Sequence, residues 1–242
     1  MTEVVKFVEE EKYCLITLDD GKANALSFDL LYQLRAALDQ AEAAGKPVII
    51  TGRPGKFSAG FDLNVMGQGG DEMMKLVNGG SELARRLLQF PTPVVLAVTG
   101  HALAMGGIML MCADYRIGTA GEFKLGLNEV AIGMALPRFG IEIARARLDP
   151  AHFELSVNCA YLYDADGAVE AGYLDEAADA GQLMTRAIAI ATQLSGLDMR
   201  AHKETKARVR APLMAALDVA VKKDFAEGGG CLLYTSDAAD EC

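Results

Sequence analysis

The stretch that decides the fold is PVVLAVTGHALAMGGIMLMCADYRIG, residues 93–118. It begins with Pro93–Thr99, an apolar and β-branched run of strand length. Small residues follow, and they lead into an apolar helical segment that ends at Asp114. Tyr115–Gly118 then has the composition of another short strand. Because packed helices alternate with strands here, the stretch predicts an α/β core with right-handed crossovers between parallel strands.

The same alternation extends toward the N-terminus. Val48–Thr51, which is VIIT, is predicted to be a buried strand, and a helix is predicted around Met73–Phe90. Ahead of that strand, Ser27 can cap a helix whose leucines and alanines recur at helical spacing until Gly45. The chain opens with a predicted hairpin, formed by Val4–Val8 and Tyr13–Leu18.

Toward the C-terminus the pattern becomes mainly helical from about Pro137, after a further short strand predicted at Glu122–Leu125. The last residues, CLLYTSDAADEC, have no helical or strand period and look foreign to the chain. We therefore predict three parts. These are a core domain at residues 1–195, a helical region at 196–228 and a foreign tail at 229–242.

Composition excludes several classes of function. Half of the 242 residues are hydrophobic (51%), so the chain can bury a large core. Its formal charge of -10 argues against a nucleic-acid or anionic-membrane surface. Five cysteines and three histidines are scattered, which predicts neither a disulfide framework nor a metal site. The N-terminus lacks an apolar leader segment, and no apolar run is long enough to span a membrane. We expect a cytoplasmic protein.

Two strand-to-helix connections could carry chemistry. The first contains FSAGFDL, residues 57–63, and the second contains the small residues from Gly100 to Gly107. Backbone N–H groups at such helix starts lack partners within the helix and can face an anion. Either connection alone is more simply explained by glycines that form turns. Together they could supply the two donors that stabilise an enolate or a tetrahedral oxyanion.

These residues resemble a known family. FSAGFDL resembles the first oxyanion-hole motif of the crotonase (enoyl-CoA hydratase/isomerase) superfamily, and GHALAMGGIMLMCADYRIG resembles the second. The resemblance runs from about Val4 to Phe225. It implies an α/β fold, a crotonase-like spiral of β-β-α repeats with a C-terminal helical region. It also implies an acyl-CoA substrate and a homotrimer or dimer of trimers.

The resemblance assigns catalytic roles to a few positions. The first oxyanion donor would be the N–H of Phe61. The second would be the N–H of Met105, with Gly106 as the neighbouring candidate. Family hydratases use two glutamates, and here the first of those positions is Ile108 while the second is Glu129. One acid/base group is therefore missing for hydration.

The segment LGLNE, which ends at Glu129, resembles the isomerases of the family, in which a single glutamate moves a proton between C2 and C4. Apolar neighbours such as Leu127 and Ile132 are expected to raise the pKa of this carboxyl group by desolvation. Without the resemblance, Glu129 would be interpreted as a solvated loop carboxylate or as a charge in the first turn of a helix.

Other polar residues are predicted to be structural. Glu142 could be a second acid, but its spacing to Arg145 favours an ordinary helix ion pair. Asp62 is expected to cap or orient the loop that follows the first donor, and Asp114 is expected to be structural. His101 is expected to be packed and hydrogen-bonded.

For the ligand, the resemblance implies coenzyme A as part of the substrate and no permanently bound cofactor. The adenine would lie near the Lys22–Ala25 loop and FSAGFDL. Candidates for contact with the phosphates are basic side chains, whose alternative role is surface charge: Lys22, Lys56, Lys203, Lys206 and Arg210. The acyl chain would meet Met66, Met73, Leu76 and the Met105 region. The predicted substrate-binding residues are Lys22, Ala23, Ala25, Ser58, Ala59, Gly60, Asp62, Leu63 and Leu127.

The leading prediction is isomerisation of a 3-enoyl-CoA to a 2-enoyl-CoA. The first alternative is hydration of a 2-enoyl-CoA, with water held by Glu129 alone or together with Glu142. The second is a homologue that binds acyl-CoA without catalysis, because a shared fold does not fix one chemistry.

Overall fold

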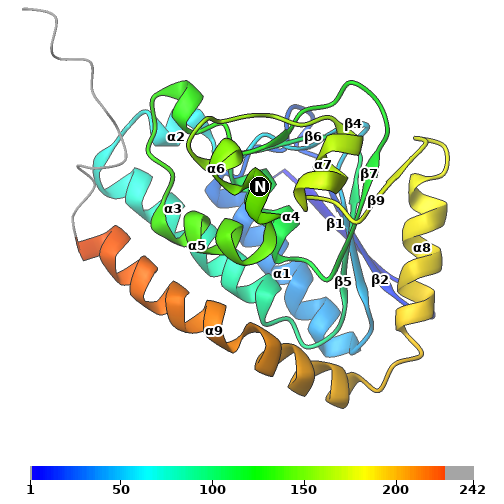
Figure 1. Ribbon diagram of the computed structural model, residues 1–242. Helices are drawn as coiled ribbons and strands as arrows, with labels where there is room; N and C mark the ends of the chain where they lie inside the picture. Colours follow the sequence, from blue (N-terminus) through cyan, green and yellow to red (C-terminus); the bar gives the residue numbers. More distant parts are fainter. Residues whose placement is uncertain (1, 227–242) are drawn as a thin grey trace, which may run out of the picture.

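The computed structural model describes residues 2–226, which form two sheets and the helices around them (Figure 1). The large sheet has six strands in the order β1-β2-β3-β5-β7-β9. The first two strands pair antiparallel, and all the other pairs are parallel. The strands are β1 (Val5–Glu9), β2 (Cys14–Leu18), β3 (Val48–Thr51), β5 (Val94–Val98), β7 (Tyr115–Thr119) and β9 (Glu176–Ala178).

A second, three-stranded parallel sheet consists of β4 (Gly55–Ser58), β6 (Gly100–Leu103) and β8 (Leu125–Gly126). Each of its strands comes directly after a strand of the large sheet, namely β3, β5 and β7. A helical segment follows each pair of strands. This is the repeated β-β-α arrangement that the resemblance implies, and it confirms the predicted fold class.

Helices cover both faces of the large sheet (Figure 1). Helix α8 (Leu183–Leu194) packs its buried Leu183, Ala187 and Ala191 against Ile49 and Val95 on one face. The other helices gather on the opposite side. They are α1 (Phe28–Ala44), α2 (Leu63–Met66), α3 (Gly70–Leu88), α4 (Met105–Cys112), the 3-10 helix η1 (Val130–Ile132), α5 (Arg138–Arg147), α6 (Pro150–Val157), α7 (Ala165–Ala171) and α9 (Met199–Ala226).

Helix α1 confirms the prediction made from its caps and spacing. The Ser27 side chain accepts a hydrogen bond from the N–H of Leu30 at the start of the helix. Gly45 ends the helix in the left-handed conformation, with a φ of 67°. The apolar face that was expected to be buried is buried: Leu30, Leu31, Leu34, Ala37, Leu38 and Ala41.

Helix α9 runs for 28 residues along α3 and α5. The buried Asp224 accepts hydrogen bonds from the backbone N–H groups of Arg138 and Phe139, and so caps the start of α5. Arg85 on α3 pairs with Asp218 at 2.7 Å. These contacts hold the start of α5, and with it the end of the loop that precedes it. Within residues 2–226, no helix combines the length and the apolarity that are needed to cross a bilayer.

Three details of the predicted secondary structure are wrong. β4 and β6 are strands where loops were expected, since these short segments lack a strand-like composition and are held by pairing with each other. The strand expected at Glu122–Leu125 begins only at Leu125. β9 was missed because the three-residue segment EAA has no strand-like composition, and it is ordered by pairing with β7. The tail predicted at residues 229–242 lies outside the described residues.

Candidate active site

The two strand-to-helix connections lie side by side because β4 and β6 pair in parallel. They approach most closely at Gly60, whose φ is 88°. A Cβ atom added there would lie 2.7 Å from the Cβ atom of Ala104 and 3.2 Å from the backbone nitrogen of Met105. Only glycine fits this position without movement. The peptide that carries the N–H of Phe61 is thereby placed beside the start of α4.

The N–H groups of Phe61 and Met105 are both unused within the part of the chain that the structure describes. The Leu26 backbone donates to the Gly60 carbonyl at 2.7 Å and accepts from the N–H of Asp62 at 3.2 Å. This bridge occupies the backbone on either side of Phe61 and leaves the Phe61 N–H without an acceptor in the described residues. Met105 is the first residue of α4, so its N–H has no carbonyl one turn earlier. Two unpaired donors therefore lie next to each other.

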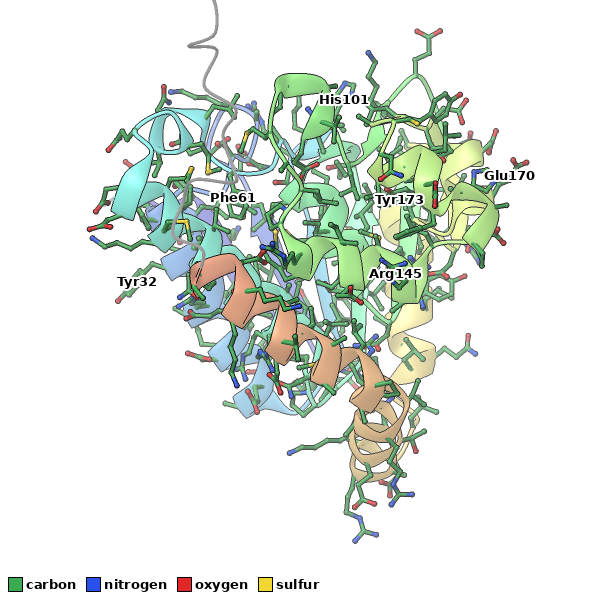
Figure 2. The ribbon with its side chains drawn as sticks, turned by 60° about the vertical axis from the view of Figure 1, so that its left-hand side comes forward. Tyr32, Phe61, His101, Arg145, Glu170 and Tyr173 are labelled. Atoms are coloured by element: carbon green, nitrogen blue, oxygen red, sulfur yellow. The ribbon has the colours of Figure 1, made fainter. Side chains whose placement is uncertain are left out.

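A cavity of about 100 Å³ opens beside these donors. Residues from both connections form one side of it, including Phe61, which Figure 2 shows next to α2 and α3. The loop between β8 and α5 forms the other side. The lining residues are Ala59, Phe61, Leu63, Met66, Val77, Ala104, Ile108, Asn128, Glu129, Ile132, Met134, Ala135 and Pro137.

Glu129 is the sole ionisable side chain among the residues that line this cavity. It is only 7% exposed, and its Oε2 atom is buried without a hydrogen-bond partner in the described chain. Burial raises the pKa of its carboxyl group from an ordinary value near 4.5 to about 7. The predicted desolvation is therefore present. A carboxyl group with this pKa can both accept and return a proton near neutral pH.

The position at which the resemblance places a second glutamate in the hydratases is occupied by an apolar residue that lines the same cavity. Ile108 lies on α4, one turn after the donor end of the helix, and is 1% exposed. Glu142 does not line the cavity. Its carboxylate is 3.7 Å from the Arg145 guanidinium, which confirms the predicted ion pair. The cavity thus combines two N–H donors, one carboxyl group and apolar walls.

The loop that carries Glu129 is closed by its own backbone. The Glu129 carbonyl accepts from the N–H groups of Ile132 and Met134, at 3.0 and 2.9 Å. Leu127 is buried beside α4, where its Cδ2 atom lies 3.5 Å from the position of a Cβ at Gly107. Leu127 was predicted to contact the substrate, but its side chain packs on α4 and is not part of the cavity wall. This packing fixes the distance between the loop and α4.

Asn24 holds the predicted ligand loop against the first connection, a role that the sequence did not reveal. It is buried with a φ of 52°, and its side chain donates to the carbonyls of Leu18 and Phe57. The Ala23 carbonyl accepts from the Ala59 N–H at 3.0 Å. The one signal available in the sequence was the asparagine itself within a loop, because asparagine is enriched among the non-glycine residues that adopt a positive φ. The structure therefore brings Lys22, Ala23 and Ala25 beside the FSAGFDL segment.

Ser58 serves the same loop and does not face the cavity. It is fully buried, and its hydroxyl group donates to the Asn24 carbonyl at 2.8 Å and accepts from the N–H of Gly60 at 3.2 Å. This hydroxyl is thus used within the protein, and the predicted contact of Ser58 with the substrate stays a prediction. Asp62 caps α2, as predicted, by accepting from the N–H of Asn64 at 2.9 Å. Ala59 and the 65% exposed Leu63 line the cavity.

The apolar side of the cavity was only partly predicted. Met66 lines it, whereas Met73 and Leu76 are buried in the core and are not among the lining residues. Ile132 and Met134, which were expected around the Glu129 carboxyl group, also line it. The wall residues that the sequence did not indicate are Val77, Ala135 and Pro137. Ala135 and Pro137 come from the loop before α5, so their place depends on how that loop folds.

The structure pairs Lys206 and Arg210, two of the candidates for a phosphate contact, with a carboxylate of the chain itself. Both side chains bind the carboxylate of Asp114, which also accepts from the Val94 N–H. Asp114 follows the C-terminal end of α4, whereas the unpaired donors are at its N-terminal end. Asp114 is thus structural, as expected. Lys203 is on the same part of α9 and is exposed.

His101 is packed and hydrogen-bonded, as predicted. Its Nδ1 atom accepts from the Lys124 N–H at 3.0 Å, and its ring meets the Phe123 ring edge-on at 5.4 Å. Lys22 and Lys56, two further candidates for a phosphate contact, are exposed near the first connection.

The buried carboxyl group predicts a pH-dependent gain in stability for Glu129→Gln. A folded-state pKa raised to about 7 means that the contribution of Glu129 to stability is present below about pH 4.5 and is lost as pH rises through 7. At pH 8 the folded protein then carries a cost of roughly 3 kcal/mol that glutamine removes. We expect the variant to unfold at higher urea concentration at pH 8, with a gain below about 1 kcal/mol at pH 5.

The matched control for this measurement is Glu142→Gln, which removes an exposed helix ion pair. Its effect should be small and similar at both pH values. An equal gain for Glu129→Gln at pH 5 and pH 8 would show that its carboxyl group does not titrate near 7 in the folded protein.

Comparison with known proteins shows which sequences and folds this chain is similar to. The family described as "Enoyl-CoA hydratase/isomerase" matches residues 9–233. An enoyl-CoA hydratase/isomerase family protein from Pseudomonas syringae has a similar structure, with a TM-score of 0.90, 45% identity and coverage of 91% of this chain and 96% of that one. An enoyl-CoA isomerase from Mycobacterium tuberculosis has a TM-score of 0.89 and 37% identity, covering 94% of this chain and 100% of that one.

Among curated proteins, the chain is similar to a probable enoyl-CoA hydratase from Bacillus subtilis, with 33% identity over 139 residues. That match covers 56% of this chain and 53% of the relative. The chain spans 18% of two plant multifunctional proteins that it also matches. It therefore spans about half or less of the length of these curated relatives, and relatives named as hydratases and as isomerases both occur.

Proposed function

Because the chain belongs to the enoyl-CoA hydratase/isomerase family, we propose that it moves the double bond of a 3-enoyl-CoA thioester to the 2-position. Coenzyme A enters only as part of the substrate. The observation that carries this proposal is the single ionisable group in the cavity. Glu129 faces an apolar wall that contains Ile108, so one carboxyl group must serve every proton transfer.

Isomerisation needs only one such group. The N–H groups of Phe61 and Met105 hold the thioester oxygen, and Glu129 removes a proton from C2. The electrons of the broken C–H bond form an enolate, whose negative oxygen is stabilised by the two donors. The protonated Glu129 then delivers the same proton to C4, and the double bond moves from C3–C4 to C2–C3. No atom is gained or lost.

Met105 is a better second donor than Gly106. The Met105 nitrogen is 3.2 Å from the Cβ position at Gly60, next to the peptide of Phe61. A Cβ at Gly106 would instead lie 2.5 Å from the Ser58 carbonyl oxygen, so Gly106 packs against β4. A methionine is acceptable at the donor position because only its backbone takes part.

The adenine and phosphates of coenzyme A are proposed to lie along the 22–25 loop. Lys22 and Lys56 are the exposed cations close to the first connection, and they favour this side of the site. The proposed assembly is a homotrimer or a dimer of trimers. Exposed apolar side chains on and before α9, such as Leu197, Val209 and Val219, support burial of this helix in a subunit contact.

The alternative is hydration of a 2-enoyl-CoA, and a relative named as a probable hydratase favours it. Hydration adds water across the double bond, which usually takes one group to activate water and another to protonate C2. Asn128 lines the cavity and cannot serve as an acid or base, and Glu142 is paired with Arg145 outside it. Glu129 would have to perform both steps alone.

The test is to supply purified protein separately with 3-hexenoyl-CoA and 2-hexenoyl-CoA and to separate the products chromatographically. We expect rapid conversion of the 3-enoyl to the 2-enoyl thioester and little 3-hydroxyacyl product. Accumulation of the 3-hydroxyacyl thioester as the main product would support the hydratase instead. Binding of both thioesters without turnover of either would support the non-catalytic homologue.

A further inference from the structure

The interior of α3 contains two adjacent glycines, Gly79 and Gly80, where glycine weakens a helix relative to alanine. Gly80 is buried, and its backbone lies against the side chain of Phe61. A Cβ atom added to Gly80 would lie 2.3 Å from Cζ and 2.6 Å from Cε1 of the Phe61 ring. At distances below 3.0 Å the Phe61 ring would have to move away from such a Cβ atom. The ring of Phe61 therefore packs directly on the backbone of α3.

The same ring is part of the cavity wall. Phe61 lines the cavity together with Val77, which precedes Gly80 by one turn of α3, and Met66 on α2. The Sδ atom of Met105 lies 3.4 Å from the Cβ position at Gly80, so α4 packs against the same spot. The ring thus fills the space between α3, the start of α4 and the cavity. The backbone of Phe61 carries the proposed N–H donor, and its side chain forms part of the cavity wall.

We propose that Gly80 determines the acyl-chain specificity of the site by seating the Phe61 ring against α3. The seated ring sets how deep the acyl part of the cavity is, and at about 100 Å³ that cavity takes short acyl chains. This inference rests on the proposed function, since it assigns a chain-length limit to the same acyl-CoA site. Gly80 acts through Phe61 and does not itself line the cavity.

Two substitutions are expected to change the depth of the cavity at the Phe61 ring in opposite directions. In Gly80→Ala the new methyl group occupies the place of the ring tip, so the ring must move into the cavity and shorten it. In Phe61→Leu the backbone N–H stays, but the side chain no longer reaches α3. Space then opens beside Gly80 and the Met105 side chain, and a longer acyl chain can enter. The double variant should behave more like the wild type, because leucine leaves room for the methyl group.

Gly79→Ala is the matched control. It makes the same change of residue in the same helix, one position earlier. Its Cβ would lie 3.0 Å from Cδ1 of Leu31, the flexible end of a side chain on α1, and no cavity residue is among its near neighbours. Both alanine variants therefore gain the same helix propensity. Only one of them touches the Phe61 ring.

The experiment measures binding of saturated acyl-CoA thioesters, butyryl-, hexanoyl- and octanoyl-CoA, by calorimetry, so that turnover is not required. The quantity compared is the ratio of octanoyl-CoA to butyryl-CoA affinity. Phe61→Leu is expected to raise this ratio by about fourfold for each methylene group that becomes buried. Gly80→Ala is expected to lower it, Gly79→Ala to leave it unchanged, and the double variant to return it toward the wild-type value.

The possible outcomes test the proposed function and the role of Gly80 in chain-length specificity separately. Failure of the wild type to bind any of the three thioesters overturns the proposed function. Binding by the wild type with the same ratio in Phe61→Leu overturns the role of the ring, even if Gly80→Ala does not fold. A shift of the ratio in the same direction by both single variants, or an equal shift by Gly79→Ala, overturns the role of Gly80.

Discussion

Replacing Glu129 by glutamine is expected to lower kcat for isomerisation of a 3-enoyl-CoA by about three orders of magnitude. The amide cannot accept the C2 proton, and no other ionisable side chain lines the cavity to replace it. Glutamine has nearly the same size and shape as glutamate, so the apolar walls and the two N–H donors should stay in place. Affinity for the thioester should therefore change little, and the loss should appear in kcat.

The pH dependence of the wild type checks the same assignment. Only the ionised carboxylate can accept a proton, and burial raises the pKa of Glu129 to about 7. The value of kcat/KM for the wild type should therefore rise with pH, with an apparent pKa of about 7, and level off above it. The residual activity of Glu129→Gln should lack this rise.

Glu142→Gln is again the matched control, because it makes the same chemical change on a carboxylate outside the cavity. Its kcat should stay within about twofold of the wild type, as expected for an ion pair at the protein surface. Retention by Glu129→Gln of more than about a tenth of the wild-type rate would mean that another group moves the proton, since a general base contributes at least about a hundredfold.

The strands of the large sheet other than β9, and helix α1, could be predicted because their signals are local. β3 and β5 are short buried runs of β-branched residues, and α1 has a cap at Ser27, a helical period and a glycine stop. The second sheet could not be predicted in this way. Its strands are two to four residues long and are formed by pairing between residues 23 to 45 positions apart, such as Lys56 with His101.

In the site, too, residues within local motifs could be predicted, whereas residues placed by long-range contacts could not. Phe61 and Glu129 were found because each lies in a short motif whose order along the chain is typical of the family. The cavity wall was predicted only in part, because Ala135 and Pro137 come to it through the folding of one irregular loop. The pairing of Lys206 could not be predicted, because the sequence does not indicate which carboxylate partner a lysine contacts. That partner, Asp114, is 92 positions away.

Gly60→Ala is expected to lower kcat by about a hundredfold to a thousandfold, although the substitution adds a single methyl group and leaves both donors in the chain. The reason is geometric. The new Cβ would lie 2.7 Å from the Cβ of Ala104 and 3.0 Å from the Leu103 carbonyl oxygen, so the first connection must move away from α4. The Phe61 N–H follows Gly60 directly, and it would move out of line with the Met105 N–H.

Part of the effect of Gly60→Ala comes from backbone strain, which the matched control isolates. Gly60 has a φ of 88°, and alanine in this region costs roughly 1–3 kcal/mol of stability. Gly45, at the end of α1, has a φ of 67° and no atom within 4 Å of its Cβ position. Gly45→Ala should therefore lose stability by a similar mechanism while its kcat, corrected for the folded fraction, stays at the wild-type value.

The comparison of these two variants decides whether the close approach of the two connections places the donors. Donors that act mainly on the developing enolate should, when displaced, lower kcat far more than they raise KM. A kcat for Gly60→Ala within about threefold of that for Gly45→Ala would be too small a loss for a displaced donor. The N–H groups of Phe61 and Met105 would then not act as a pair held by Gly60, and the oxyanion would have to be stabilised elsewhere in the cavity.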